Sequence, residues 1–501
     1  MRLYTAEEMS RADLGAQELG IPGGILMERA GAEMARVALE IYAPERALVV
    51  AGGGNNGGDG FVVARELHRT GVDVAVLPTK DEYEGDPATN LTILRNLAVR
   101  FVGPDDLDAE LDRTDLVIDA LLGTGFSGEV REREARLIEG INGSSAPVLA
   151  VDVPSGVDGA TGEVQGAAVR ADVTVCAHAA KVGCVISPGR ERAGEVVAVD
   201  IGIPPEADVE SSLVWTDADS LRGRIPRTAE PAHKYSAGAL LVVAGSRHTT
   251  GAPVMVVRGA ERTGCGIAFL ATSQSSAPSV DLELTEALVH GVPEGGEGYM
   301  TAAALEEILE LAGRTSALVV GPGMGVGEEG GRLVEGILRE VDSPVLLDAD
   351  ALTNLAGIEA LAVRRAPTVI TPHAGELGRL VGTGAKEVSA HRLRSARGAA
   401  EEYGCYVLLK GSDTLVVEGE KVAVNSTGDV ALATAGTGDV LSGVIGALLS
   451  RGMYPYEAAR AGAWVHGRAA ELWLEEAGWP AESLIATDLL EYLPLAVGEL
   501  L

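Results

Sequence analysis

The chain of 501 residues contains few cysteines, and they are scattered. The four are Cys176, Cys184, Cys265 and Cys405, and no two of them form a CxxC pair. No apolar run is long enough to span a bilayer, and the N-terminal residues lack the apolar core of a signal peptide. These absences disfavour a zinc site, a disulfide framework and a membrane protein, and they predict a protein of the reducing cytoplasm.

Positive charge is also scarce. The chain has 40 basic and 73 acidic residues, a formal net charge of −33. A broad basic surface for nucleic acid is therefore excluded, and any phosphate site needs its own local donors. Because arginine is the usual basic residue here, each lysine is a functional candidate. The lysines are Lys80, Lys181, Lys234, Lys386, Lys410 and Lys421.

Apolar, β-branched runs alternate with helical patterns through the first two hundred residues. This alternation predicts a mostly parallel, doubly wound sheet, a Rossmann-like three-layer α/β/α domain. The predicted strands are Ala47–Val50, Val72–Leu77, Leu116–Ala120, Val148–Val151, Val173–Cys176 and Val196–Ile201. Before them, residues 5–40 are predicted as helical, with breaks at Gly20 and at 22–24 and a capping box of Thr5 with Glu8.

A second α/β series follows a stretch rich in Pro, Asp, Glu and Ser at residues 203–231, which we predict to be a linker. We therefore expect two domains, residues 1–210 and 216–501. The strands predicted in the second are Ala239–Ala244, Ile267–Leu270, Ala317–Val320, Val345–Leu347, Thr368–Ile370 and Val407–Leu409. The last helices are predicted to begin near Val440 and Tyr456.

The first half carries a glycine-rich turn, residues 52–60, directly after a predicted strand. Glycine allows the backbone to approach a ligand closely, and a following helix start can hold an anion. Asn55 and Asn56 supply amide oxygens that suit an alkali or alkaline-earth cation. The alternative is a purely structural turn into a helix expected at 61–69.

Carboxylates follow three strands of this half. In an open parallel sheet, ligands bind beyond the carboxyl ends of the strands. We therefore expect Asp59, Asp119 and Asp152 to converge there, although each could instead be a helix cap. Lys80 also follows a strand and could pair with one of these acids.

Four motifs of this half, NNGGDG, DALLGTG, VDVPSGVDG and AKVG, together resemble the YjeF N-terminal family of NAD(P)H-hydrate epimerases over about residues 5–204. The resemblance implies catalysis by Asp152 and Lys80, and potassium binding by Asn56, Asp119 and Ser155. The residues it implies for the hydrate and its phosphates are Asn55, Asn56, Gly57, Gly58, Asp59, Gly123, Thr124, Gly125, Phe126, Ser127, Gly128 and Glu129.

The second half contains the turn Ala435-Gly436-Thr437-Gly438-Asp439, which resembles the GxGD turn of ribokinase-like enzymes. In those enzymes backbone N–H groups form an anion hole and the Asp acts as a base. Alone, the turn could be an ordinary helix start. GPGMG, DADAL, TPHAGE and LLKGSDT, each after a predicted strand, would lie along one edge of the same sheet.

Together with HKYSAG, these motifs resemble the ADP-dependent NAD(P)H-hydrate dehydratases, which are ribokinase-like, over about residues 216–501. The resemblance implies ADP and magnesium as cofactors, Asp439 as the base, and Ala252, Gly323 and His373 as hydrate contacts. The residues implied for the adenine nucleotide are Lys410, Gly411, Ser412, Asp413, Thr414 and Gly438. Glu376 would either help to place magnesium or be structural, and His373 could instead be a core histidine.

The two resemblances imply one bifunctional enzyme that epimerises NADH hydrate and NADPH hydrate and then dehydrates the S epimer with ADP. We expect no nucleic-acid or membrane partner, and a homo-oligomer. Two alternatives stay open at this point. The second half could be a small-molecule kinase for a vitamin-precursor alcohol, and the first half could be a binding module without catalysis.

Overall fold

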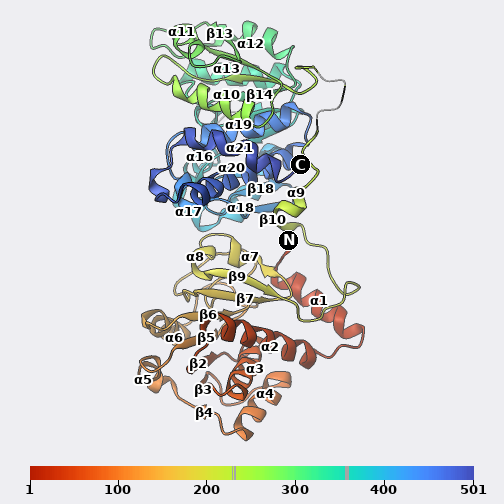
Figure 1. Cartoon of the computed structure of the whole chain (residues 1–501), viewed down its shortest axis with the longest axis vertical. Helices are drawn as coiled ribbons and strands as arrows, with labels where there is room; N and C mark the ends of the chain where they lie inside the picture. Colours follow the sequence, from red (N-terminus) through yellow and green to blue (C-terminus); the bar gives the residue numbers. More distant parts are fainter. Residues whose placement is uncertain (228–229, 231–232, 356–359) are drawn as a thin grey trace. The chain divides into compact units, whose positions relative to one another are not determined.

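The computed structural model describes residues 1–227, 230, 233–355 and 360–501. The chain folds as two compact units, one of Arg2–Val214 and one of Trp215–Leu501 with Met1 (Figure 1). The division between the units falls inside the stretch at 203–231 that was predicted as a linker. Residues 228–229 and 231 of that stretch are not among the residues that the structure describes. Within the described ranges, no helix combines the length and apolar character needed to cross a membrane.

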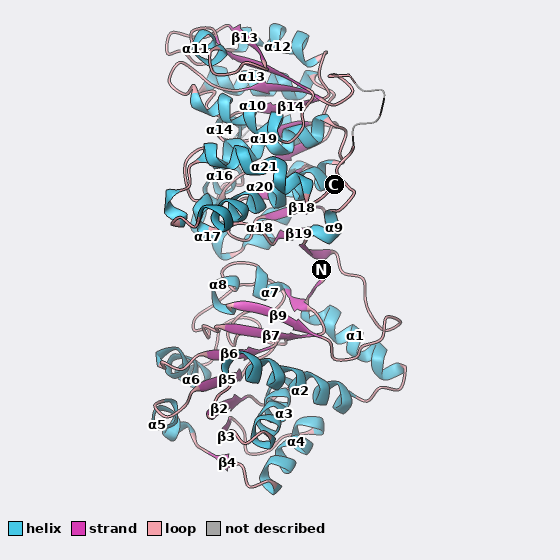
Figure 2. Ribbon diagram, in the orientation of Figure 1, coloured by secondary structure: helices cyan, strands magenta, loops and turns pink. Residues whose placement is uncertain are grey.

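The first unit is built on a parallel sheet with the strand order β4-β3-β2-β5-β6-β7-β9 (Figure 2). The order reverses between β2 and β5, so the loops after these two strands diverge and leave room for a ligand. The strands are β2 (Arg46–Ala51), β3 (Asp73–Pro78), β4 (Arg100–Phe101), β5 (Leu116–Ala120), β6 (Val148–Val151), β7 (Val173–Ala177) and β9 (Glu195–Val199). Separately, β1 (Leu3–Tyr4) pairs with β8 (Ala180–Lys181).

Helices cover both faces of this sheet. Since side chains alternate along a strand, β2 buries Val49 and Ala51 in one hydrophobic cluster and Leu48 and Val50 in another. The first cluster includes α1 (Ala6–Glu18), α2 (Gly23–Tyr42), α3 (Asn55–Arg69) and α4 (Gly85–Asn96), and the second includes α5 (Leu107–Leu111) and α6 (Glu132–Gly143). Two short helices, α7 (Val182–Val185) and α8 (Arg190–Ala193), follow β8. The predicted three-layer architecture is confirmed.

The glycine-rich segment after β2, residues 52–60, is helical from Asn55 onward. The predicted helix at 61–69 begins earlier, because Asn55 to Gly60 form the first turns of α3. A side chain on Gly57 would lie 1.9 Å from the Gly52 carbonyl oxygen, and one on Gly58 would meet Met27 and Pro87. Glycine has low helix propensity, but only glycine lets this helix start pack so closely against its neighbours. The predicted capping box of Thr5 and Glu8 opens α1 as expected.

The second unit is built on a larger sheet with the order β10-β19-β18-β17-β16-β15-β14-β11-β12-β13. It is parallel from β17 to β13 and reverses its order between β11 and β14. The strands are β10 (Leu213–Thr216), β11 (Ala239–Val243), β12 (Ile267–Ser273), β13 (Leu288–Val292), β14 (Ala317–Val320), β15 (Val345–Leu347), β16 (Thr368–Ile370), β17 (Tyr406–Leu409), β18 (Leu415–Glu418) and β19 (Lys421–Asn425).

Helix α19 lies at the centre of this unit. A side chain on its Gly446 would meet Val319 of β14 and Leu240 of β11, so the helix rests directly on the sheet. It packs against α10 and α20, and α20 packs against α21. The helices are α9 (Ala218–Leu221), α10 (Gly251–Arg262), α11 (Ala277–Asp281), α12 (Leu305–Ala312), α13 (Glu328–Glu340), α14 (Asp350–Leu355), α15 (Ala360–Val363), α16 (Ala374–Leu380), α17 (Ala385–Ala390), α18 (Arg392–Tyr403), α19 (Thr437–Ser450), α20 (Pro455–Ala477) and α21 (Ala486–Gly498).

Every predicted strand overlaps a strand of the structure, but the antiparallel edge of the second sheet was not predicted. There β18 and β19 form a hairpin that turns at Gly419, whose φ is +53°. The alternating pattern of residues 415–425 around a Gly-containing turn was the signal for it.

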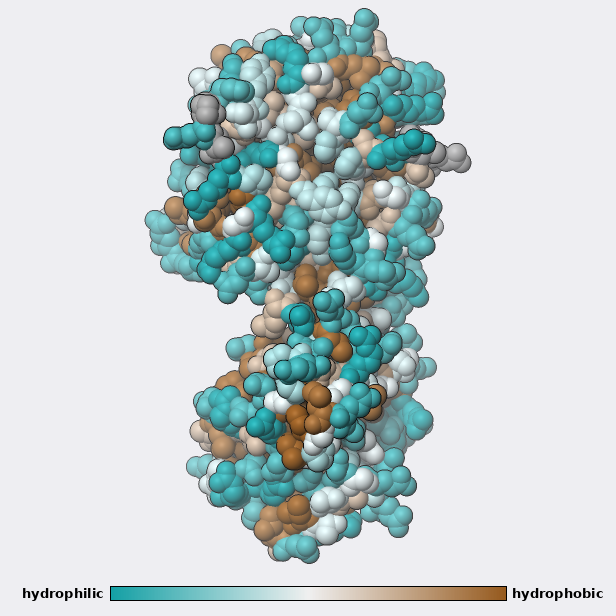
Figure 3. All heavy atoms as spheres, turned by 90° about the vertical axis from the view of Figure 1, so that its right-hand side faces the viewer, coloured by the Kyte–Doolittle hydropathy of each residue, from teal (hydrophilic) through white to brown (hydrophobic). Residues whose placement is uncertain are grey.

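The surface reflects the acidic composition. The face shown in Figure 3 is mainly hydrophilic, interrupted by small apolar patches. Many arginines of the protein surface form ion pairs with nearby acids, as Arg36 does with Glu33 and Glu40 one turn away on α2. An arginine or lysine without such a partner therefore stands out.

Candidate active sites

A cavity of about 1130 Å³ lies at the point where the strand order of the first unit reverses. Most small-molecule pockets measure roughly 300–1,000 Å³, so this one is large enough for a dinucleotide. Its walls are the first turn of α3, the loop after β5, the end of β6 and one side of α1. It brings together eleven of the predicted residues, namely Asn55, Asn56, Asp59, Lys80, Gly123, Thr124, Gly125, Phe126, Ser127, Glu129 and Asp152.

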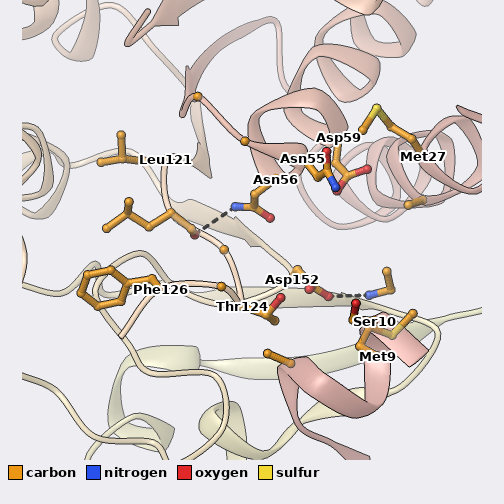
Figure 4. Close-up of a pocket in the computed structure, with 18 of the residues that line it drawn as sticks. Met9, Ser10, Met27, Asn55, Asn56, Asp59, Leu121, Thr124, Phe126 and Asp152 are labelled. Atoms are coloured by element: carbon orange, nitrogen blue, oxygen red, sulfur yellow. Dashed lines mark hydrogen bonds between the residues drawn. The ribbon is translucent and has the colours of Figure 1, made fainter. Parts of the chain in front are cut away.

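Asp152 forms the electrostatic centre of this cavity. It follows β6 in a left-handed conformation, with φ of +67°, which few residues other than glycine adopt. Its Oδ1 accepts hydrogen bonds from the Ala177 N–H at 3.0 Å and from Lys181 Nζ at 2.7 Å. Figure 4 shows the carboxylate reaching into the cavity, with Asp59 on the same side and Phe126 on the other.

The partner of Asp152 is Lys181, which the prediction did not place in the site. Lys181 is fully buried and also donates to the carbonyls of Ala177 and Ala179, at 2.8 and 3.0 Å. Burial lowers the pKa of Lys181, but the charge of Asp152 and the thiols of Cys176 and Cys184 outweigh it, so the pKa is raised. Lys181 therefore stays charged and forms a buried ion pair with Asp152. The signal for it was a retained lysine within the AKVG motif.

Lys80 lines the same cavity, but its side chain lies over Gly53 and does not pair with Asp152. A side chain on Gly53 would lie 2.6 Å from Lys80 Nζ, so the ammonium group lies over that glycine. The described residues contain no ion pair between Lys80 and Asp152. The role implied for Lys80 in catalysis stays a prediction.

Asp119 and Ser155 lie beneath the cavity rather than in its wall. Both are fully buried, and Ser155 donates its N–H and its hydroxyl to the Asp119 carboxylate at 2.8 and 2.6 Å. Burial raises the pKa of Asp119 to about 6, against the opposing effect of these hydrogen bonds. The Leu122 peptide joins the group, because its N–H donates to Ser155 Oγ and its carbonyl accepts from Asn56 Nδ2 at 3.0 Å (Figure 4). The side chains of Asn56, Ser155 and Asp119 are thus connected through the Leu122 peptide.

In the second unit, Asp439 lies in the first turn of α19. The helix begins at Thr437, earlier than predicted, and Gly436 with φ of +91° makes the sharp entry. Burial and the nearby charge of Asp348 raise the pKa of Asp439 to about 7, although Lys410 opposes this. A carboxylate that changes its protonation state near neutral pH suits a general base.

Lys410 acts electrostatically on Asp439 and pairs with two acids, Asp348 after β15 and Glu376 of α16. Its Nζ lies 2.8 Å from Asp348 Oδ1 and 3.8 Å from Glu376 Oε2. Ser442, one turn after Asp439, donates to the other oxygen of Asp348 at 2.8 Å. Asp348 is thus a site residue that the prediction omitted, and its signal was the DADAL motif after a strand.

His373 and Glu376 cap helix α16. The Glu376 carboxylate accepts the His373 N–H at 2.8 Å, and His373 Nδ1 accepts the Gly375 N–H at 2.9 Å. The His373 side chain is 55% exposed, so the reading of it as a core histidine is excluded. Glu376 is buried, and its carboxylate has the structural role of capping the start of α16.

Apart from Gly438, which lies in the first turn of α19, the other predicted residues of this unit fall into two groups. Gly323 and Ala252 meet where the strand order reverses, since a side chain on Gly323 would lie 3.2 Å from Ala252 Cβ. In the loop at 410–414, Asp413 is buried and forms an ion pair with Arg392 at 2.9 Å. Asp413 therefore stabilises the loop from inside, whereas Gly411 and Ser412 are exposed.

Comparison with known proteins places both halves of the chain in known families. Residues 240–495 match the family model for NAD(P)H-hydrate dehydratase, and residues 23–183 match that for the YjeF-related protein N-terminus. The bifunctional NAD(P)H-hydrate repair enzyme Nnr of Thermofilum pendens is 39% identical over 100% of this chain and 97% of its own length. This chain belongs to the family of bifunctional NAD(P)H-hydrate repair enzymes.

Further relatives of the repair-enzyme family extend the match. The enzyme of the same name from Salinibacter ruber is also 39% identical, over 99% of this chain and 96% of its own length. A ribokinase-like superfamily protein from Enterococcus faecalis aligns with a TM-score of 0.50 at 20% identity, covering 58% of this chain and 97% of its own. That likeness shows the ribokinase-like fold of the second unit.

Proposed function

We propose that the protein repairs hydrated NADH and NADPH in two steps, epimerising the R and S hydrates in its first unit and dehydrating the S hydrate in its second. The observation that carries the proposal is the Asp152–Lys181 pair in a cavity of dinucleotide size, in a chain that belongs to the repair family along its whole length. The small-molecule kinase alternative has less support, since the epimerase-type half would then have no role.

The epimerase substrate is a hemiaminal, with a hydroxyl on C6 beside the ring nitrogen. That centre inverts either by losing and regaining its oxygen or by opening and closing the ring, and both routes need an acid and a base. Asp152, hydrogen-bonded to Lys181, supplies the base. A potassium ion, held by oxygens of Asn56, Asp119 and Ser155, would fix the substrate against the Leu122 loop.

In the dehydratase, Asp439 takes the proton of the C6 hydroxyl, whose oxygen attacks the terminal phosphoryl group of ADP and releases AMP. The ring nitrogen then expels the phosphate, and loss of the C5 proton restores the dihydropyridine. The N–H groups at the start of α19 and Lys410 face the transferring group, and Ala252, Gly323 and His373 hold the hydrate. Magnesium, when bound, neutralises charge on the nucleotide phosphates.

Mixing the full-length protein with both epimers of NADH hydrate and excess ADP tests the whole proposal. The absorbance of reduced nicotinamide is expected to return fully, with one AMP and one phosphate formed per NADH. Recovery of only half would contradict the epimerase, and a stable phosphorylated product without recovery would favour a kinase. The rate of spontaneous epimerisation is first measured without the protein. The enzymatic reaction is then followed for a shorter time than spontaneous epimerisation takes.

Two arginines indicate how the cavity holds the phosphates of its substrate. Arg131 and Arg133 line it beside the loop of residues 123–129, and neither forms an ion pair within the described ranges. In so acidic a protein, unpaired cations at one cavity favour an anionic ligand. We propose that they contact the dinucleotide phosphates, together with Lys80.

The double variant Arg131→Gln/Arg133→Gln is expected to raise the epimerase KM for the R hydrate about 10- to 100-fold, because a hydrogen bond to a charged group contributes about 1.5–3 kcal/mol. The kcat is expected to change little. Initial rates over a range of R-hydrate concentrations measure both. Arg136→Gln, on the same helix but paired with Glu132, is the matched control. An unchanged KM in the double variant would refute the phosphate contacts.

A further inference from the structure

Helix α1 forms one wall of the first-unit cavity, although it precedes the residues that match the epimerase-type family model. The residues that line the cavity recur at helical spacing on one face of α1. They are Ala6, Met9, Ser10, Asp13 and Gln17. Figure 4 shows Met9 and Ser10 of this helix next to Asp152. The wall is therefore placed against the proposed reacting groups.

Asp13 is the only carboxylate on this face of α1 among the cavity-lining residues. It is partly buried, and no hydrogen bond or ion pair of its side chain is found among the described residues. The titratable groups that it faces are Asp59 of α3, Asp152 after β6, His178 after β7 and Lys181 at the end of β8. A carboxyl group that lines the same cavity as Asp152 and has no structural partner is available to a substrate.

Lys181, the ion-pair partner of Asp152, does not offer a proton as readily as Asp13. Lys181 has three N–H donors, and all three are used by Asp152, Ala177 and Ala179. Its pKa is raised, so it holds its proton firmly. By contrast, burial and then the charge of Asp152 raise the pKa of Asp13 to about 6, against Lys181 and His178. Asp13 therefore carries a proton under mildly acidic conditions and gives it up more easily.

We propose that Asp13 is a second catalytic residue of the epimerase, acting as the acid that complements Asp152. This inference rests on the proposed epimerase function. Asp13 protonates the C6 oxygen, the C6–O bond breaks, and water leaves with the ring nitrogen forming an iminium. Water then adds to the other face of C6 and loses its proton to Asp152. The reverse reaction uses the same two carboxyl groups with their roles exchanged, so protons and electrons balance.

Asp13→Asn in the full-length protein tests this assignment. The kcat for epimerisation of the R hydrate is expected to fall about 10²- to 10⁴-fold, the contribution typical of a positioned acid or base, with KM within about threefold of wild type. Dehydration of purified S hydrate is expected to be unchanged and reports on folding. The matched control is Glu18→Gln, which removes an exposed carboxylate from the same helix.

The pH profile separates an acid from a merely structural residue. Since Asp13 must be protonated, wild-type epimerase kcat/KM is expected to fall as pH rises through about 6. The residual activity of Asp13→Asn should lack this descending limb, and Asp13→Glu should restore activity with the limb displaced. An Asp13→Asn enzyme with wild-type kcat, or an Asp13→Glu enzyme with an unshifted limb, would overturn the inference. A wild-type protein without epimerase activity would instead refute the proposed function.

Discussion

Replacing Asp439 by Asn is expected to reduce the ADP-dependent dehydration of S-NADH hydrate about 10²- to 10⁴-fold, because the substrate hydroxyl loses its base. Asparagine keeps the size of the side chain and one of its two acceptor oxygens at the start of α19. Binding of ADP, measured by titration calorimetry, should therefore be retained. Epimerisation in the other unit should be unaffected and provides an internal control.

The pH dependence sharpens this prediction. Because the pKa of Asp439 is about 7, wild-type kcat/KM for dehydration should rise with pH through about 7 and then level off. A raised pKa of a folded carboxyl means that its ionisation opposes folding at higher pH. Asp439→Asn should thus melt no lower than wild type at pH 8, so the loss of activity cannot come from unfolding. Glu482→Gln, an exposed acid of the same unit, is the control, and near-normal turnover of Asp439→Asn would exclude the base.

Replacing Asp152 by Asn is expected to abolish exchange between the hydrate epimers, with a loss of about 10²- to 10⁴-fold in kcat. The dehydratase should still convert purified S hydrate at the wild-type rate. A mixture of epimers with ADP should then recover only half of its reduced-nicotinamide absorbance. Continued conversion of the R hydrate by Asp152→Asn would contradict the assignment of the base.

Lys181 allows stability and catalysis to be measured separately. Removing one partner of a buried ion pair costs about 3–5 kcal/mol, because the other charge is left uncompensated. Lys181→Met and Asp152→Asn should each lower the free energy of unfolding, and the double variant should be more stable than the sum of the two effects predicts. All three are expected to lack epimerase activity. A stable double variant that epimerises would show that the pair serves folding alone.

Much of the architecture could be predicted because local pattern and tertiary structure agree. The run at 148–151 is apolar throughout and the run at 116–120 is apolar except for Asp119, as expected for strands buried on both faces, and their bounds coincide with β6 and β5. The start of α3 was placed too late, since glycine disfavours helices locally. Only the close contact of Gly57 with Gly52 explains why the helix extends back to Asn55.

The sequence by itself determined the two α/β units, the family and eleven of the residues that line the first cavity, because strand ends and glycine-rich motifs are local features. Only the tertiary structure decided which charges meet. Lys181 follows Asp152 by 29 positions, and Lys410 follows Asp348 by 62, yet each pair lies within hydrogen-bond distance. Parallel strands bring their carboxyl ends to one edge regardless of separation in the chain, and burial then fixes each ion pair. For that reason the lysine that holds Asp152 is the buried Lys181, whereas Lys80 lies over Gly53.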